Sequence, residues 1–195
     1  MEKPPVLQEI SCQQVLVDES SVHSSQWMFV SERYSALVTP RYLLDRYLTY
    51  LRQITLSLVR PVETKDRIEF RLAGTGRSML SFTLPEEGND GCSLHLAICG
   101  GFLVQPDNSR RGQLAFLVKL ERDELKVMVH LSDYCPLLLG GPRPSALRRW
   151  LYRLTQALIH KKVTVSFLSR IYRELAGDGA CVRHVRVRPA SGRET

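Results

Sequence analysis

The segment His130-Leu131-Ser132-Asp133-Tyr134-Cys135 carries the densest group of chemically reactive side chains in the sequence. Imidazole, carboxylate and thiol groups are the usual components of acid–base and nucleophilic sites. Such a site requires these groups in contact and oriented by a third partner, which spacing along the chain does not establish. His130, Asp133 and Cys135 are therefore only weak catalytic candidates, and we favour a strand that ends in a capped turn.

Two histidines fall on the same side of the apolar alternation around them. His95 and His130 both alternate with aliphatic residues, so in a sheet they would share the face opposite those aliphatics. Imidazole binds transition metals, and Cys99 or Glu69 would be the third ligand. A metal site needs three or more ligands that converge, and the sequence does not indicate this convergence. We predict no metal site and no cofactor.

Neither glycine-rich segment has the pattern of a phosphate-binding loop. Gly74-Thr75-Gly76 has the composition of a hairpin turn, and Gly100-Gly101 is not followed by Lys-Ser or Lys-Thr. Paired glycines within a strand are more typical of a bulge or a bend. We expect Gly100-Gly101 to curve the sheet.

The charge of the chain is concentrated near its C-terminus. Residues 141–195 contain twelve Lys and Arg residues against three acids, whereas residues 1–140 contain fifteen against seventeen. Such asymmetry indicates a surface for an acidic protein, nucleic acid or an anionic membrane. The alternative that we favour is the solvated side of an amphipathic helix. The candidate polyanion-binding residues are Arg148, Arg149, Arg153, Lys161 and Lys162.

Two amphipathic helices are expected to position these groups. The first has Thr39 as N-cap and Pro40 in its first turn, and Pro61 ends its pattern. Its apolar stripe consists of Leu43, Tyr47, Leu51, Ile54 and Leu58. The second is a long tract that opens near Pro144 or Ser145, passes through Leu147, Leu151, Leu154 and Leu158, and ends at Gly177 or Gly179. The β-branched residues of 163–165 predict a kink or a division into two helices.

Five segments between the helices alternate apolar and polar residues with a period of two. They are residues 67–72, 79–84, 93–98, 113–118 and 125–131. Short polar links join them, so we predict an antiparallel meander with one face on the core. The core would form where Leu43, Tyr47, Leu51 and Ile54 pack on Phe70, Phe82, Leu96, Phe116 and Val129.

The length of 195 residues favours one domain. We predict an α+β domain over residues 27–188, preceded by a polar N-terminal arm (1–26) with one short strand and followed by a disordered tail (189–195). Residues 182–187 would add a last strand, for five to seven strands in all. Neither a signal peptide nor an apolar run of membrane-spanning length is apparent, which favours a soluble protein in the cytoplasm. Five widely spaced cysteines indicate buried free thiols rather than disulfides.

The order of strand, long helix, antiparallel meander and long C-terminal helix resembles the helix-grip fold, the START and Bet v 1-like family of ligand-binding domains. The resemblance covers residues 27–176 and lies in the order of elements. It implies a curved sheet that wraps the last helix around an apolar cavity, with an apolar small molecule or lipid inside. The residues expected at this cavity are Leu151, Leu154, Leu158, Phe116 and Gly100.

Three functions remain open at this level. The resemblance favours non-catalytic binding of an apolar small molecule or lipid. The first alternative is an adaptor whose basic helix binds nucleic acid, an acidic protein or an anionic membrane surface. The second is an enzyme that uses the same cavity around His130 and Asp133. A cavity beneath the long helix would favour ligand binding.

Overall fold

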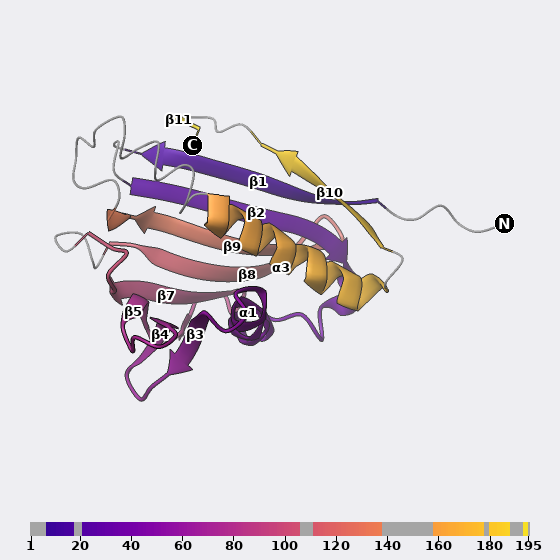
Figure 1. Ribbon diagram of the computed structural model, residues 1–195. Helices are drawn as coiled ribbons and strands as arrows, with labels where there is room; N and C mark the ends of the chain where they lie inside the picture. The colour runs from indigo at the N-terminus through magenta and orange to yellow at the C-terminus, as the bar shows by residue number, and fades with distance from the viewer. Residues whose placement is uncertain are drawn as a thin grey trace.

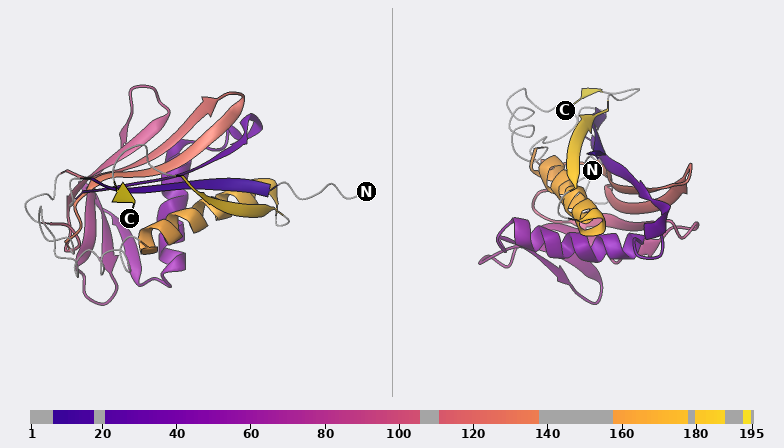
Figure 2. Two further views of the ribbon diagram at one scale, coloured as in Figure 1. Left: turned by 90° about the horizontal axis from the view of Figure 1, so that it is seen from above. Right: turned by 90° about the vertical axis from the view of Figure 1, so that its right-hand side faces the viewer.

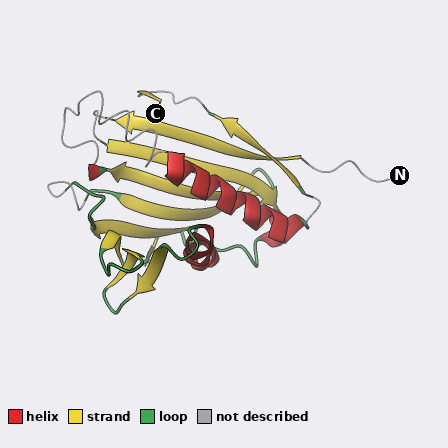
Figure 3. Cartoon of the chain, viewed as in Figure 1, coloured by secondary structure: helices red, strands yellow, loops and turns green. Residues whose placement is uncertain are grey.

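Two helices lie on one face of a large curved sheet in the computed structural model of the chain (Figures 1 and 3). The structure describes residues 7–17, 21–105, 111–137, 158–177, 180–187 and 193–194. The helices are the 3₁₀ helix η1 (Glu32–Tyr34), α1 (Pro40–Ile54) and α3 (Leu158–Ala176). The strands are β1 (Leu7–Val17), β2 (Ser21–Ser31), β3 (Val59–Glu63), β4 (Arg67–Leu72), β5 (Ser78–Thr83), β6 (Glu86–Glu87), β7 (Ser93–Gly100), β8 (Gln113–Glu121), β9 (Glu124–Tyr134), β10 (Cys181–Arg186) and β11 (Arg193–Glu194).

The strands form one sheet in the order β10-β1-β2-β9-β8-β7-β5-β4-β3, with β11 beside β1 and β6 beside β7. All five strands predicted for the meander are present, in antiparallel pairs. The β10–β1 pair is parallel, unlike the rest of the sheet. β9 runs in the same direction as β1, because each is antiparallel to β2. The chain must therefore cross over between β9 and β10, and this connection contains α3. The predicted last strand is thus confirmed, and the structure has more strands than the five to seven expected.

The N-terminal segment differs most from the prediction. We expected a polar arm with one short strand over residues 1–26. This segment instead contains β1, which is eleven residues long, and the first part of β2, which is also eleven residues long, and both strands belong to the sheet. The inward face of β2 contains the buried polar residues Ser24 and Gln26 between Val22 and Met28. The Gln26 amide donates a hydrogen bond to Ser24 Oγ at 2.8 Å, which compensates part of the cost of burying it. These two polar residues interrupt the apolar alternation that identifies a strand in a sequence.

The start of α1 is as predicted, but its end comes earlier. Thr39 Oγ1 accepts a hydrogen bond from the Tyr42 backbone N–H at 3.1 Å, and Pro40 is the first helical residue. The helix ends at Ile54, and Ile54 and Leu58 are 49% and 57% exposed instead of buried. Pro61 lies in β3, an edge strand, where a missing N–H is tolerated.

The predicted division into two helices near residue 163 does not occur, since α3 is continuous from Leu158 to Ala176. Val163, Thr164 and Val165 are all buried. Tertiary packing therefore outweighs the lower helix propensity of β-branched residues here. Gly177 ends the helix as predicted, with φ of 96° and its N–H bonded to the Arg173 carbonyl at 2.8 Å. In the tail predicted to be disordered, Arg193 and Glu194 instead pair with β1.

The core lies between the concave face of the sheet and the two helices (Figure 2). The ring of Tyr47 in α1 contacts Phe116 in β8 at a centroid distance of 5.4 Å and Phe167 in α3 at 5.2 Å. Phe70 and Phe82 form a second aromatic pair at 5.0 Å. Apart from Ile54, every residue that we expected in this core is buried.

Candidate functional site

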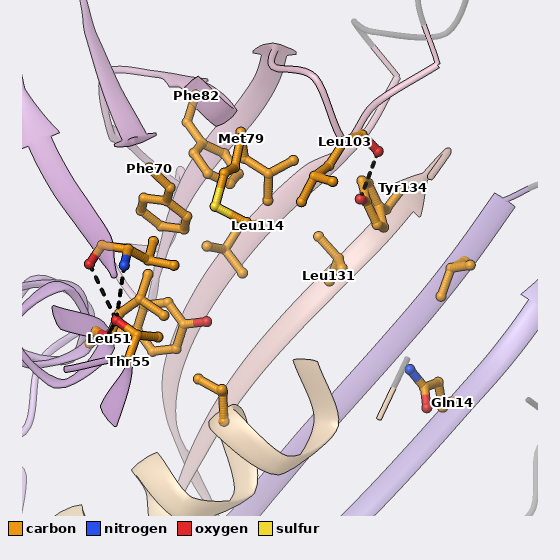
Figure 4. A pocket seen from close by; sticks show the side chains of 15 residues that line it. Gln14, Leu51, Thr55, Phe70, Met79, Phe82, Leu103, Leu114, Leu131 and Tyr134 are labelled. Carbon is orange, nitrogen blue, oxygen red and sulfur yellow. Dashed lines mark hydrogen bonds between the residues drawn. The ribbon is translucent and has the colours of Figure 1, made fainter. Parts of the chain in front are cut away.

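A cavity of about 200 Å³ lies between the concave face of the sheet, α1 and α3 (Figure 4). The sheet supplies most of its wall, α1 supplies two residues, and α3 supplies one. The lining residues are Gln14, Val22, Tyr47, Leu51, Thr55, Val59, Phe70, Met79, Leu80, Phe82, Leu103, Leu114, Leu131, Tyr134 and Val163. Eleven of these fifteen side chains are aliphatic, phenylalanine or methionine, so the cavity suits an apolar occupant.

Most of the polar groups at this wall already have partners within the protein. The Tyr134 hydroxyl donates to the Leu103 carbonyl at 3.0 Å, and Thr55 Oγ1 donates to the Leu51 carbonyl at 2.7 Å while it accepts from the Val59 N–H at 3.1 Å (Figure 4). Burial raises the pKa of Tyr47 to about 12, so its phenol is neutral at physiological pH. An occupant therefore meets a wall without charge.

A close approach of two backbones shapes one side of the cavity. Gly101 follows β7 with φ of 114°, and a Cβ at this position would lie 2.3 Å from the Met79 carbonyl oxygen. Only glycine lets this segment pass so close to β5, whose Met79 and Leu80 line the cavity. The pairing of β5 with β7 shifts register between Ser81 and Phe82. The glycine pair thus marks an irregular part of the sheet.

The residues that we expected at the cavity are only partly placed by the structure. Leu151 and Leu154 lie outside the described residues, and Leu158 is the first residue of α3. Phe116 and Gly100 are not among the described lining residues, and Phe116 is fully buried beneath Tyr47. Among the described residues of α3, Val163 lines the cavity. The contribution of α1 and β5 was not predicted, because their lining residues have the same pattern as core residues.

The weak catalytic candidates lie away from the cavity. Leu131 lines the cavity, so the neighbouring His130 faces the convex side, where its Nδ1 is 2.7 Å from Ser25 Oγ. Asp133 contacts His23 Nε2 at 3.4 Å and accepts a hydrogen bond from Ser21 Oγ at 3.2 Å. This geometry does not support an enzyme that uses the cavity around His130 and Asp133. His23 and Ser25 were missed because they lie on β2.

Cys135 does not join His130 in a nucleophilic pair. It is buried, and its thiol lies 3.6 Å from the backbone carbonyl of Asp133. Burial raises the pKa of Cys135, with a smaller opposing effect from Arg111. The reactive thiolate is therefore disfavoured. All five cysteines are free: Cys12 is also buried, whereas Cys181 is exposed.

The convex cluster predicts a dependence of stability on pH. Burial lowers the pKa of His130, and the neighbouring His23 and His95 lower it further. Asp133 opposes this shift. The unfolded chain then binds the proton more readily, so the free energy of unfolding should fall as pH drops below about 6.5. The slope from one group is at most about 1.4 kcal/mol per pH unit. It should level off below the folded-state pKa.

Urea unfolding of the protein and of His130→Gln at a series of pH values checks this expectation. The His130→Gln variant should show a shallower loss of stability between neutral and mildly acidic pH. The control is His184→Gln, because His184 is exposed on β10. Equal pH profiles for the protein and His130→Gln would contradict the prediction.

The two histidines considered for a metal site flank Ala115 on the convex face, since both His95 and His130 pair with it in register. His95 Nε2 lies 2.9 Å from Ser93 Oγ. Among the residues that the structure describes, no group of three or more His, Cys, Asp or Glu side chains has the geometry to hold a metal ion. Cys99 and Glu69 therefore do not complete a site with these histidines.

Only two of the five predicted polyanion-binding residues lie in the part of the chain that the structure describes. Arg148, Arg149 and Arg153 lie outside the described residues. Lys161 is half-buried and Lys162 is exposed, both on α3. Elsewhere in the basic quarter, Arg170 pairs with Glu174 and Arg183 pairs with Glu9. The polyanion-binding surface stays a prediction. No helix in the described ranges is long and apolar enough to cross a membrane.

Comparison with known proteins gives similarity at the level of structure only. No family model and no curated protein matches the chain. Solved structures similar to it include the Aha1 dimer from Colwellia psychrerythraea (TM-score 0.44, 13% identity, covering 80% of this chain and 98% of that one). Ara h 8.0201 is similar with a TM-score of 0.38 and 12% identity, covering 75% of this chain and 97% of that one. Human STARD10 is similar with a TM-score of 0.35 and 11% identity, covering 82% and 69%.

The predicted helix-grip architecture is confirmed by the structure. Its defining features are the curved, largely antiparallel sheet and the two helices held on the concave face (Figure 2). The α+β class is confirmed with it.

Proposed function

We propose that the protein binds a small apolar molecule, or the apolar part of a lipid, in the cavity between the sheet and the two helices. The observation that carries this proposal is a cavity of about 200 Å³ with an almost wholly apolar wall. Close-packed cores contain few voids larger than one water molecule, and an apolar cavity of roughly 150 Å³ can stay dry and bind benzene. The size and wall of this cavity therefore favour an apolar guest over water.

The properties of the wall narrow the class of ligand. The cavity is smaller than the range of roughly 300–1,000 Å³ that drug-sized ligands occupy, so a short alkyl chain or a small ring system fits best. The neutral Tyr47 phenol and the paired hydroxyls of Thr55 and Tyr134 offer no counter-charge. A charged headgroup would have to stay outside, because an unpaired charge is costly to bury.

A series of straight-chain alcohols of increasing length tests the proposal by isothermal titration calorimetry. Each buried methylene contributes about 0.8 kcal/mol, so affinity should rise about fourfold per carbon until the cavity is full. Beyond that length the gain should stop, because additional carbons remain in water. Native mass spectrometry of the purified protein would show in parallel whether an apolar molecule co-purifies.

A steady gain without a limiting length would indicate nonspecific adsorption and contradict the proposal. The absence of saturable binding across the series would contradict it as well. A defined limit, together with a stoichiometry of one, is the expected result.

A further inference from the structure

The turn that joins α1 to β3 exposes three large aliphatic side chains within five residues. Ile54 is 49% exposed, Leu56 is 92% exposed and Leu58 is 57% exposed. A single exposed leucine needs no explanation in a protein, but a local group of them marks an interaction surface. We call residues 54–58 the apolar turn.

The backbone holds Leu56 outward in an unusual conformation. Leu56 and Ser57 have φ angles of 50° and 62°, in the left-handed region that bulky residues rarely adopt. The Ser57 N–H bonds to the Arg52 carbonyl at 2.7 Å, and the Leu58 N–H bonds to the Thr55 carbonyl at 2.9 Å. A conformation of this kind persists only where the surrounding structure enforces it, and such positions concentrate at functional sites.

The charge around the apolar turn is positive. The two sequence segments that meet here, residues 46–62 and 70–85, contain five arginines and no acidic residue. The Ala73 N–H bonds to the Leu58 carbonyl at 2.8 Å, which joins the β4–β5 hairpin to the turn. Arg46 pairs with Glu174 and Arg71 pairs with Glu69. The other three, Arg52, Arg60 and Arg77, are exposed and have no acidic partner among the described residues.

The apolar turn is also part of the cavity wall. Leu51, Thr55 and Val59 line the cavity, whereas the intervening Ile54, Leu56 and Leu58 face solvent. Thr55 and Val59 are half-buried, so the cavity wall and the solvent-exposed turn alternate along the same segment. A partner bound to the turn would lie next to the ligand.

We propose that the apolar turn docks the protein on an anionic lipid bilayer, where Leu56 and its neighbours enter the apolar layer and the arginines meet the headgroups. An apolar group flanked by basic residues matches the chemistry of this interface, since burial and charge attraction both contribute there. The inference extends the proposed function, because it makes the membrane the source or the destination of the apolar ligand. Docking itself does not require that the cavity be filled.

Sedimentation with vesicles of phosphatidylcholine, with and without phosphatidylglycerol, tests docking. The full chain should bind the anionic vesicles more strongly, and added salt should weaken this binding. Leu56→Asn should reduce the partition coefficient about tenfold or more, because it removes the most exposed apolar side chain. Asparagine tolerates the left-handed backbone, so the fold should be preserved.

The matched control is Leu37→Asn. Leu37 is 55% exposed in the turn before α1, at the opposite end of that helix, and this variant should bind vesicles as the unchanged protein does. A second variant, Leu56→Trp, should show a blue shift in fluorescence when anionic vesicles are added. Circular dichroism of all three variants checks that they are folded.

The outcomes separate docking from ligand binding. Failure of the unchanged protein to sediment with anionic vesicles would overturn docking and leave the turn as a contact for another protein. Equal losses for Leu56→Asn and Leu37→Asn would also overturn it. Saturable alcohol binding without vesicle binding would retain the proposed function alone. Vesicle binding that depends on Leu56, without alcohol binding, would retain docking and contradict the proposed ligand.

Discussion

Replacing Phe116 with alanine is expected to lower the free energy of unfolding by about 3–5 kcal/mol. Phe116 is fully buried in β8, the central strand of the sheet, and its ring contacts Tyr47 of α1 at 5.4 Å. The substitution removes the ring and leaves a void where a strand and a helix meet. Because Phe116 is not among the described lining residues of the cavity, no ligand site is deleted directly. Urea unfolding followed by circular dichroism gives the measurement.

Leu120→Ala is the control in the same strand. Leu120 is 49% exposed, so its truncation should change the free energy of unfolding by no more than about 0.5 kcal/mol. A loss below about 1 kcal/mol for Phe116→Ala would mean that this face of β8 does not carry the core. The register that pairs Phe116 with Leu94 and Val129 would then be incorrect.

The parts of the fold that the sequence predicts are those in which one face of an element is apolar throughout. In β4, Ile68 and Phe70 alternate with charged residues, and in β7 Leu94, Leu96 and Ile98 do the same with polar or small residues. Period-two alternation of this kind assigns both the strand and its buried face. The first part of β2 was missed because buried Ser24 and Gln26 remove the apolar signal while they remain within the sheet.

The order of elements predicts a cavity, but the sequence does not predict which residues line it. Leu51 and Tyr47 line it, and Leu43 and Leu44 on the same helix are packed core, although all four belong to one apolar face. Whether an apolar side chain meets another or a void depends on how far the helix lies from the sheet, which periodicity does not encode. The early end of α1 depends on hydrogen bonds of Thr55 that no capping pattern announces.

Filling the cavity from the sheet should weaken ligand binding with little change in stability. Leu131 in β9 lines the cavity and is largely buried, and phenylalanine at this position would extend into about 200 Å³ of space. Additional carbons usually cost about 1–3 kcal/mol in a well-packed core, but here they occupy a void and gain contacts. We expect Leu131→Phe to change the free energy of unfolding by less than about 1 kcal/mol. Its affinity for the best alcohol of the series should fall about tenfold or more.

The same enlargement at a packed position provides the contrast. Leu96 is 1% exposed on the concave face of β7 and is not among the described lining residues, so Leu96→Phe should lose about 1–3 kcal/mol of stability. If folded, the Leu96→Phe variant should still bind alcohols, because the cavity stays open. Leu131→Phe should also shorten the chain length at which affinity stops rising, since less of the cavity remains. Unchanged binding and an unchanged limiting length in Leu131→Phe would mean that the alcohols bind elsewhere, and the cavity would then have no role in the function proposed for it.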